Sequence, residues 1–561
     1  MITAVSSPMA LRTESMSLEE KIAQMVIVRA KDYREGTRRL IAQGRVAGVG
    51  AISLVKESLP QVVEQLNEYL AAGSAPLTLY VDAETGLAQM FPFALRYPPQ
   101  MAIGASGSEE VAYAVGRAIG EDCRAMGFTM IGSPVLDICS NPNNPIVGVR
   151  SFSENVELVI RLARAYTKGL QDAGMLTTGK HFPGHGDTRE DSHVTVPLVD
   201  KAVDRLWREE LAPYQALAEE LWGVMTAHIC YPALGCEDEP ATFRREVIYG
   251  LLRKKIGFRG LIVSDSLTMR SVRERYGVEE CAIRAVEAGH DIILQDIESL
   301  PERTLEALYG AVRSGRIPEA WINESVNRIL AYKEKSGSMQ NTPLEEEAVR
   351  AALTAPAHRR AAQTAADAGV TLIEACTLPL DRKRAGKTLV LVTDAEEVSK
   401  GIYDFGLAGP SPEERLDREF KCRCDAQTRL IPEDPTPEEV RALAEAAQAY
   451  DTVVLASFVR VVCYKEGSGA MPRGQLALVQ ALQERAKQPV LLLFGSPFPL
   501  RELPDLDNCL VAYGDDEFCM RAAVRAVFGE LTPTGRLPVY VKERYPYGYR
   551  KEIEYEKGEE A

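Results

Sequence analysis

The chain has 561 residues, of which 46% are hydrophobic and 26% are charged, a composition typical of globular proteins rather than of disordered or fibrous ones. Lysine and arginine together number 65 against 80 aspartate and glutamate residues, which gives a formal net charge of −15. This acidic balance argues against a protein that wraps a nucleic acid, because binding a phosphate backbone requires clustered lysine and arginine.

The cysteines and the N-terminus predict a soluble protein of a reducing compartment. Eleven cysteines, an odd number, are scattered without the C-x-x-C spacing of zinc sites, so we expect reduced thiols. Residues 1–10 lack the basic and apolar regions of a signal peptide, and no apolar run approaches the roughly 20 residues that span a bilayer. We therefore expect a cytoplasmic protein with no membrane or nucleic-acid partner. The sequence leaves the oligomeric state open.

Residues 1–335 alternate short apolar runs with amphipathic stretches. The strand candidates are residues 25–29, 48–54, 77–81, 129–138, 175–179, 223–229, 260–264 and 291–295. Helical periodicity lies between several of them, at residues 109–126, 154–173, 204–220 and 244–256. Ser108 and Ser153 are the expected N-caps of the first two helices. A doubly wound open sheet shares this alternation, but the count of eight favours a (β/α)8 TIM-type barrel.

A linker and a smaller domain follow the predicted barrel. Helical patterns at residues 301–314 and 318–333 close the barrel, and residues 336–356 are predicted to form a linker. Residues 357–561 have their own strand candidates, at residues 388–394, 451–457, 489–495 and 509–514. Helical patterns at residues 437–449 and 475–486 lie between them. We expect an α/β/α sandwich domain here, and the sequence leaves open whether it contributes to a functional site.

Three of the six histidines fall within thirteen residues of one polar segment, whose sequence is Lys180-His181-Phe182-Pro183-Gly184-His185-Gly186-Asp187-Thr188-Arg189-Glu190-Asp191-Ser192-His193. This segment begins where the fifth strand candidate ends. Other polar residues stand at the ends of the third, sixth and seventh candidates, namely Asp82, Glu84, His228 and Asp265. Because the C-terminal ends of barrel strands build the active site, we predict that these side chains share one rim.

Three other interpretations of these residues stay open at this point. Asp265 could cap the helix that follows it. Gly174-x4-Gly179-Lys180 matches most of a phosphate-binding loop, but His181 stands where the Mg²⁺-binding hydroxyl belongs. A metal site is the third interpretation, with the possible ligands His181, His185, Asp187, Asp191 and His193. Such ligands would need an irregular loop, because Pro183 and the glycines disfavour a helix, and we predict neither a metal nor another cofactor.

The histidine segment resembles the signature of family 3 glycoside hydrolases of the β-N-acetylglucosaminidase branch. Supporting matches are Ser133-Pro134-Val135-Leu136-Asp137, Val149-Arg150-Ser151-Phe152-Ser153, Met225-Thr226-Ala227-His228 and Val263-Ser264-Asp265-Ser266-Leu267. The second region is similar to the α/β/α sandwich of that family and ends in Phe528-Gly529 and Gly535-Arg536-Leu537-Pro538-Val539. The resemblance therefore covers nearly the whole chain.

This resemblance implies a retaining exo-β-N-acetylglucosaminidase that removes terminal β-linked N-acetylglucosamine from a carbohydrate substrate. The expected substrates are cell-wall (muropeptide) fragments. Asp265 would be the nucleophile, and Asp191 with His193 would be the acid/base dyad. The hydroxyls of the terminal sugar would be bound by Asp82, Arg150, Lys180 and His181.

The residue types in the dyad suit this chemistry. Histidine can donate and then accept a proton near neutral pH, and a carboxylate two residues away can orient its ring. Gly184 and Gly186 would let the loop that carries His193 swing in after substrate binds, which is our hypothesis for water exclusion.

One loop departs from the family pattern and keeps alternatives open. The family usually has Asp-x-Glu-Gly-Gly-x-Val-Gln here, whereas this chain has Asp82-Ala83-Glu84-Thr85-Gly86-Leu87-Ala88-Gln89. A β-glucosidase of the same family is one alternative. A glycosyl phosphorylase is another, because a neutral histidine would not repel phosphate. A catalytically silent sugar-binding protein is an alternative from a different class.

Overall fold

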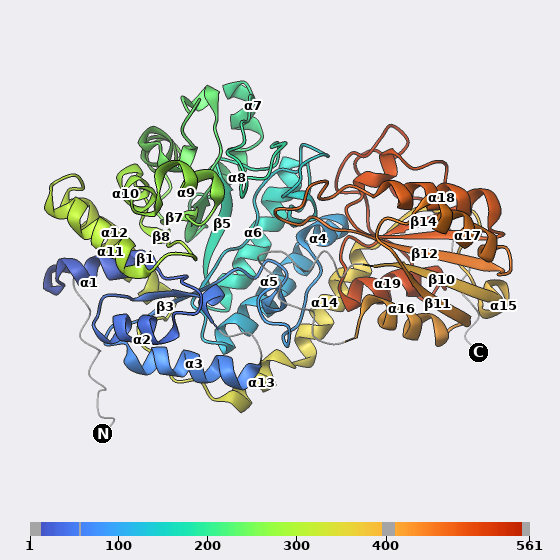
Figure 1. Cartoon of the computed structure of the whole chain (residues 1–561), viewed down its shortest axis with the longest axis horizontal. Helices are drawn as coiled ribbons and strands as arrows, with labels where there is room; N and C mark the ends of the chain where they lie inside the picture. Colours follow the sequence, from blue (N-terminus) through green and yellow to red (C-terminus); the bar gives the residue numbers. More distant parts are fainter. Residues whose placement is uncertain (1–12, 55–57, 395–409, 553–561) are drawn as a thin grey trace.

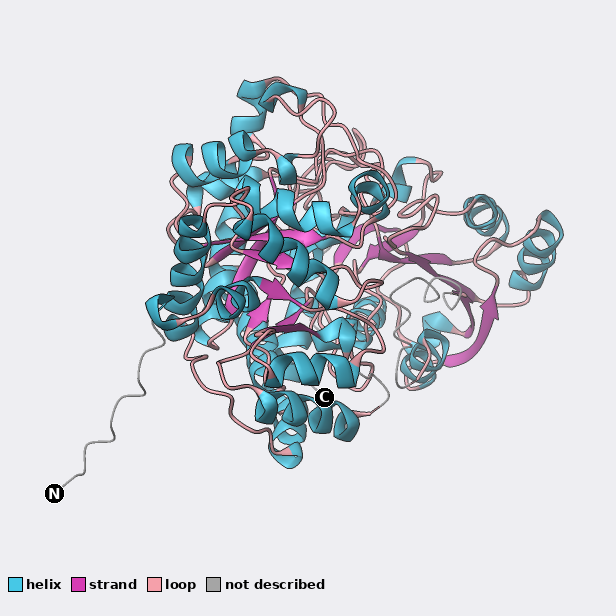
Figure 2. Ribbon diagram, turned by 60° about the vertical axis from the view of Figure 1, so that its left-hand side comes forward, coloured by secondary structure: helices cyan, strands magenta, loops and turns pink. Residues whose placement is uncertain are grey.

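The structure, a computed structural model, describes residues 13–54, 58–394 and 410–552 (Figure 1). An eight-stranded barrel forms the blue-to-green part of the chain, and an α/β sandwich forms the orange-to-red part. Figure 2 shows that helices surround the strands of the barrel. Both parts of the predicted fold class are confirmed.

The barrel strands are short and all parallel. They are β1 (Val26–Ile27), β2 (Gly48–Gly50), β3 (Thr78–Val81), β4 (Met130–Ile131), β5 (Leu176–Phe182), β6 (Gly223–Thr226), β7 (Leu261–Ser266) and β8 (Ile292–Leu294). Their order is β1-β8-β7-β6-β5-β4-β3-β2, and a parallel bridge between Val28 and Val49 closes the ring. These strands are nearly all buried, because the barrel interior covers one face and helices cover the other.

Helices surround the barrel. They are α1 (Leu18–Met25), α2 (Arg34–Ala42), α3 (Leu59–Ala72), α4 (Gln100–Ser106), α5 (Glu109–Ala125), α6 (Val156–Asp172), α7 (Val203–Arg208), α8 (Ala212–Ala216), the π-helical η7 (Glu246–Lys255), α9 (Arg270–Tyr276), α10 (Val278–Ala288), α11 (Pro301–Arg313) and α12 (Glu319–Lys335). Ser108 caps α5 as predicted, because its side chain accepts a hydrogen bond from the backbone N–H of Val111. The prediction that Ser153 caps α6 is wrong, since Asn155 does so through the N–H of Leu158.

The expected single helix over residues 204–220 is also wrong, because α7 and α8 are separate short helices. Pro213 lies in the first turn of α8, where its missing N–H is tolerated, but it cannot continue a helix from α7. Helix α13 (Glu346–Leu353) lies within the segment that we predict to be a linker and packs against α5 and α3.

The sandwich is built on a six-stranded sheet in the order β11-β10-β12-β13-β14-β9. Its strands are β9 (Thr371–Ala375), β10 (Lys387–Thr393), β11 (Asp425–Ile431), β12 (Thr452–Val459), β13 (Pro489–Gly495) and β14 (Asn508–Val511), all parallel except β9. Two groups of helices pack against the sheet, and the helices within each group contact one another. One group is α14 (Pro356–Gly369), α16 (Pro412–Lys421) and α19 (Glu517–Val527), and the other is α17 (Pro437–Ala447) and α18 (Arg473–Arg485). The short α15 (Arg382–Ala385) precedes β10.

The two units are in direct contact. Helix α14 packs against α4 and α5 of the barrel, and Arg501 donates a hydrogen bond of 2.7 Å to the side-chain oxygen of Asn143. Across residues 13–54, 58–394 and 410–552, none of the helices has both the length and the apolar character to cross a membrane.

Candidate active site

A cavity of about 380 Å³ opens at the C-terminal ends of the barrel strands. Its volume lies within the range of small-molecule binding sites. The barrel lines it with the predicted residues Asp82, Glu84, Arg150, Lys180, His181, His193 and Asp265. The sandwich lines it as well, with residues that include Arg460, Val461, Val462, Cys463, Tyr513 and Asp515. The second domain therefore contributes to the wall of this cavity.

Asp265 belongs to β7 and faces the cavity. Its Oδ1 accepts a hydrogen bond of 2.6 Å from the backbone N–H of Ser266. Burial would raise the pKa of Asp265, but the imidazoles of His181, His228 and His193 outweigh burial and lower this pKa to about 2. The cap interpretation is wrong, because the next helix, α9, begins at Arg270 and has no side-chain cap. Asp265 is therefore an ionised carboxylate that faces the cavity.

The Asp191–His193 pair forms as the sequence spacing suggests. Oδ1 of Asp191 lies 2.7 Å from Nδ1 of His193 and also accepts the backbone N–H of His193 at 2.9 Å. The pKa of Asp191 is lowered to about 2, since hydrogen bonds and the charge of His193 outweigh the effect of burial. With Nδ1 engaged by Asp191, Nε2 is the ring nitrogen left for a ligand in the cavity. Asp191 itself does not line the cavity.

Glu84 is the centre of an ion-pair network at the ends of β3 and β5. Arg150 binds it with two nitrogens, both at 2.8 Å, and the Lys180 ammonium lies 2.7 Å from Glu84 and 3.1 Å from Asp82. Burial opposes ionisation of Glu84, but the two cations outweigh it and hold the pKa of Glu84 far below its usual value. These pairs fix three of the four predicted sugar-binding residues in orientation: Glu84 holds Arg150 and Lys180, and Lys180 in turn holds Asp82.

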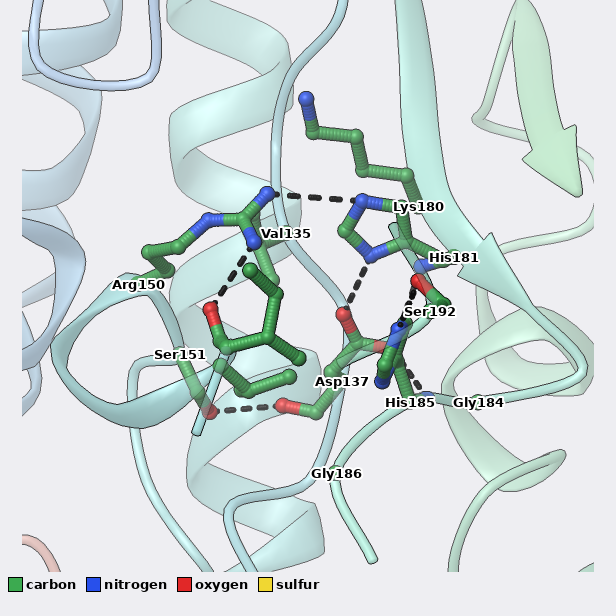
Figure 3. A network of polar contacts seen from close by, with 12 residues as sticks. Val135, Asp137, Arg150, Ser151, Lys180, His181, Gly184, His185, Gly186 and Ser192 are labelled. Carbon is green, nitrogen blue, oxygen red and sulfur yellow. Dashed lines mark hydrogen bonds and ion pairs between the residues drawn. The ribbon is translucent and has the colours of Figure 1, made fainter. Parts of the chain in front are cut away.

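The fourth, His181, is held by Asp137 (Figure 3). Nδ1 of His181 lies 2.7 Å from Oδ2 of Asp137, whose Oδ1 accepts the backbone N–H groups of His181 and His185. On the other side of the ring, Nε2 lies 3.4 Å from an Arg150 nitrogen. Asp137 thus orients His181 and joins it to the Glu84 network through Arg150.

His185 is held by side chains of its own loop. Its two ring nitrogens lie 2.9 Å from Thr188 Oγ1 and 2.8 Å from Ser192 Oγ, and burial lowers the pKa of His185 to about 4. Asp187 instead pairs with Lys201 at 3.2 Å. Over the described parts of the chain, no three His, Cys, Asp or Glu side chains are grouped so that they could hold a metal ion. The metal interpretation therefore lacks a ligand set there.

The phosphate-loop interpretation is wrong for a topological reason. The residues that would form the loop are strand β5 itself, which runs from Leu176 to Phe182 and pairs with β4 and β6. Its backbone N–H groups are committed to the barrel, so they cannot wrap a phosphate.

The two loop glycines are explained by close packing. A Cβ atom at Gly186 would lie 1.6 Å from the carbonyl oxygen of Ile138, and one at Gly184 would lie 2.6 Å from the Glu210 side chain. The loop is further held by Ser271, whose hydroxyl donates to the Ser192 carbonyl at 2.6 Å. The swing of this loop on substrate binding stays a prediction, and in this structure His193 already faces the cavity.

The loop that departs from the family pattern presents only part of its changed sequence to the cavity. Leu87 is fully buried in the barrel core, whereas Thr85, Ala88 and Gln89 line the cavity. Oε1 of Gln89 accepts the backbone N–H of Glu84 at 2.9 Å, which braces the loop. Of the two changes, Thr85 is the one that can contact a ligand.

Comparisons with known proteins agree with this architecture. The model of the glycosyl hydrolase family 3 N-terminal domain matches residues 17–332. The curated β-hexosaminidase A of Pseudoalteromonas piscicida is 30% identical over 365 residues, which cover 60% of each of the two chains and so less than two thirds of that relative. The β-N-acetylglucosaminidase/β-glucosidase of Cellulomonas fimi is 26% identical over 542 residues, covering 93% of this chain and 94% of its own.

A solved structure extends the similarity to both domains. The family 3 β-N-acetylglucosaminidase from Paenibacillus sp. str. FPU-7 superposes with a TM-score of 0.78 at 32% identity, covering 94% of this chain and 99% of that one.

Proposed function

Since this chain belongs to glycosyl hydrolase family 3, we propose that it is a retaining exo-β-N-acetylglucosaminidase that hydrolyses terminal β-linked N-acetylglucosamine. The observation that carries the proposal is that Asp265 and His193 line one cavity together with the Glu84 ion-pair network. A nucleophile, a proton donor and fixed sugar-binding groups around one bound sugar are what retaining hydrolysis requires. The names of the similar proteins support the choice of sugar.

In the first step the Asp265 carboxylate attacks the anomeric carbon, and the bond from that carbon to the leaving oxygen breaks. Protonated His193 gives its Nε2 proton to this oxygen, so the aglycone departs as a neutral alcohol. Asp191 holds Nδ1 and stabilises the positive charge that the imidazole carries before the transfer.

In the second step a water molecule displaces Asp265 from the glycosyl ester. Neutral His193 takes a proton from this water, which regenerates the imidazolium and frees the Asp265 carboxylate. Two displacements at one carbon return the sugar with its original β configuration.

The ion-pair network supplies the binding of the terminal sugar in this proposal. The ammonium of Lys180 and the guanidinium of Arg150 donate hydrogen bonds to sugar hydroxyls, and Asp82 accepts them. Because each of these groups has a partner in the protein, little rotational freedom is lost when the sugar binds.

We also propose that the substrates are cell-wall (muropeptide) fragments in the cytoplasm. All eleven cysteines are free thiols, which supports a reducing compartment. Incubation with purified muropeptides should release N-acetylglucosamine, detected by mass spectrometry of the products. Release from simple aryl glycosides without any release from muropeptides would remove this part of the proposal.

A panel of 4-nitrophenyl β-glycosides, assayed with and without phosphate, tests the reaction itself. We expect cleavage of the N-acetylglucosaminide, preference over the glucoside, and free N-acetylglucosamine as product in both buffers. Preference for glucose would assign the chain to the β-glucosidase alternative. Formation of sugar 1-phosphate when phosphate is present would assign it to the phosphorylase alternative, and no turnover of any member would favour a sugar-binding protein.

A further inference from the structure

One segment of the sandwich domain contacts the Asp191–His193 dyad. This segment follows strand β12 and comprises residues 460–469, which we name the clamp segment. Its residues Val461, Val462 and Cys463 line the cavity, so the segment forms part of the wall of the site. It is separated from the dyad by some 270 positions in the sequence, as Tyr464 and Asp191 are 273 residues apart.

Tyr464 contacts both members of the dyad. Its backbone N–H donates a hydrogen bond of 2.6 Å to Oδ2 of Asp191, and its ring centroid lies 5.0 Å from that of His193 with the planes tilted by 57°. The other carboxylate oxygen of Asp191 already accepts from His193. Both oxygens of Asp191 are therefore fixed, one by each domain, and the imidazole is bordered by an aromatic ring.

The backbone at Tyr464 adopts a conformation that L-residues rarely use, with φ at +64°. Such a conformation persists where the surroundings impose it, and it is often found at functional sites. Here it directs the Tyr464 N–H to the carboxylate of Asp191.

The clamp segment is anchored to the barrel independently of the dyad. The Ser468 hydroxyl donates to the carbonyl of Pro145 at 2.7 Å and accepts the backbone N–H of Val462 at 2.7 Å. Within the sandwich, Lys465 pairs with Glu433 at 2.6 Å. Ser468 therefore anchors the clamp segment to the barrel and also joins the two ends of the segment by a hydrogen bond.

We propose that Tyr464 is a positioning residue for the Asp191–His193 dyad, contributed by the second domain. This inference rests on the proposed glycosidase function. A carboxylate held at both oxygens keeps the imidazole at a fixed angle to the leaving oxygen, and proton transfer depends steeply on such alignment. The contact acts on the dyad and not on Asp265, so its loss should impair protonation of the leaving group and spare nucleophilic attack.

The test compares β-N-acetylglucosaminides whose leaving group needs a proton with those whose leaving group does not. The value of kcat/KM reports glycosyl transfer to the enzyme. For Ser468→Ala, which frees the clamp segment and with it the Tyr464 N–H, we expect kcat/KM to fall about tenfold or more with a methyl or disaccharide leaving group. With 2,4-dinitrophenolate it should change less than about twofold, since this leaving group needs no general acid. Tyr464→Ala keeps the backbone N–H and removes only the ring beside His193, so it should show the same selective loss to a smaller extent.

The matched control is Glu466→Ala, because this side chain is exposed within the same segment. It should leave both kcat/KM values unchanged. Equal losses with both leaving groups in Ser468→Ala, or no loss in this variant, would overturn the inference. If Tyr464→Ala does not fold, Ser468→Ala alone decides. Failure of the unaltered protein to cleave any of the substrates would instead overturn the proposed function.

Discussion

Asp265 and Asp191 keep their negative charge over the whole range in which such an enzyme works. Both have a pKa lowered to about 2, in each case because partners outweigh the cost of burial. Protonation of these carboxylates therefore removes activity only when the pH falls toward about 2 to 3.

The leaving-group dependence of kcat/KM should separate the roles of Asp265 and His193. His193→Ala should lower kcat/KM about 10²- to 10⁴-fold on a poor leaving group, which departs only when it is protonated. On a 2,4-dinitrophenyl substrate, whose leaving group needs no proton, kcat/KM should stay nearly unchanged. Equal losses on both substrates would assign the proton donor to another residue.

Most residues of the candidate site were predictable, because their residue types and their positions at strand ends indicate their chemical roles. The cavity is lined by Asp265, His193 and all four predicted sugar-binding residues. Asp137 was visible only as part of a supporting motif, since a buried carboxylate that orients a histidine has no pattern of its own in sequence. Tyr464 was missed altogether. Its contribution is a backbone N–H, which every residue except proline possesses.

At the scale of elements, the loop after β5 determines where His193 lies. Gly186 lets this loop pass directly over the backbone of Ile138, and the Ser271 and Arg270 contacts hold the loop on its other side. A side chain at position 186 would force the loop outward and carry the dyad with it.

Gly186→Ala should accordingly lower kcat/KM by at least about tenfold, because a displacement near 1 Å of a catalytic group has effects of this size. Circular dichroism should show the helix content preserved. The control is Gly310→Ala in α11, where a Cβ atom meets nothing within 4 Å, and it should keep full activity with equal or greater thermal stability. Unchanged activity in Gly186→Ala would show that the loop tolerates displacement and would favour the swinging loop.

The elements that sequence patterns missed have weak or ambiguous signals. Strand β11 is the edge of the sandwich sheet and most of its residues are partly or fully exposed, so it lacks the apolar run of a central strand. The stretch over α7 and α8 has continuous helical periodicity, and only Pro213 indicates that the helix is interrupted there. The central strands β10, β12 and β13 were predictable because they are uniformly apolar.

At the scale of the whole molecule, a buried polar cluster joins the sandwich helix α14 to the barrel helix α5. His358 lies 2.7 Å from Asp122 and 3.0 Å from Glu121, and Asp122 also accepts a hydrogen bond of 2.7 Å from Tyr97. The hydrogen bond to Asp122 raises the pKa of His358 despite partial burial. Since the raised pKa belongs to a base, the stability that this histidine adds is complete below its unfolded pKa of roughly 6.5 and is lost as the pH rises through the folded value.

His358→Gln should therefore lower the melting temperature by about 1 to 2 °C at pH 6 and by less at pH 9. Differential scanning fluorimetry of both proteins across this range measures the gap. A gap that widens with pH would contradict the assigned sign, and a constant gap would mean that the contribution is packing alone.

The contact between the two domains at the site is a property of the whole molecule that no local pattern reveals. The cavity combines strand ends of the barrel with residues near 460–463 and 513–516 of the sandwich, which are brought together only by folding. The alternation of strands and helices predicts each domain separately and does not predict how they face each other.

Trapping of the covalent intermediate tests the central claim most directly. A 5-fluoro β-N-acetylglucosaminyl fluoride reacts through its good leaving group, and the ring fluorine slows hydrolysis of the ester, so the glycosyl-enzyme should accumulate. We predict an intact-mass increase of one sugar, located on Asp265 by tandem mass spectrometry of the digested protein and absent in Asp265→Ala. An adduct on another residue, or turnover of the reagent with no adduct at any time, would contradict the account.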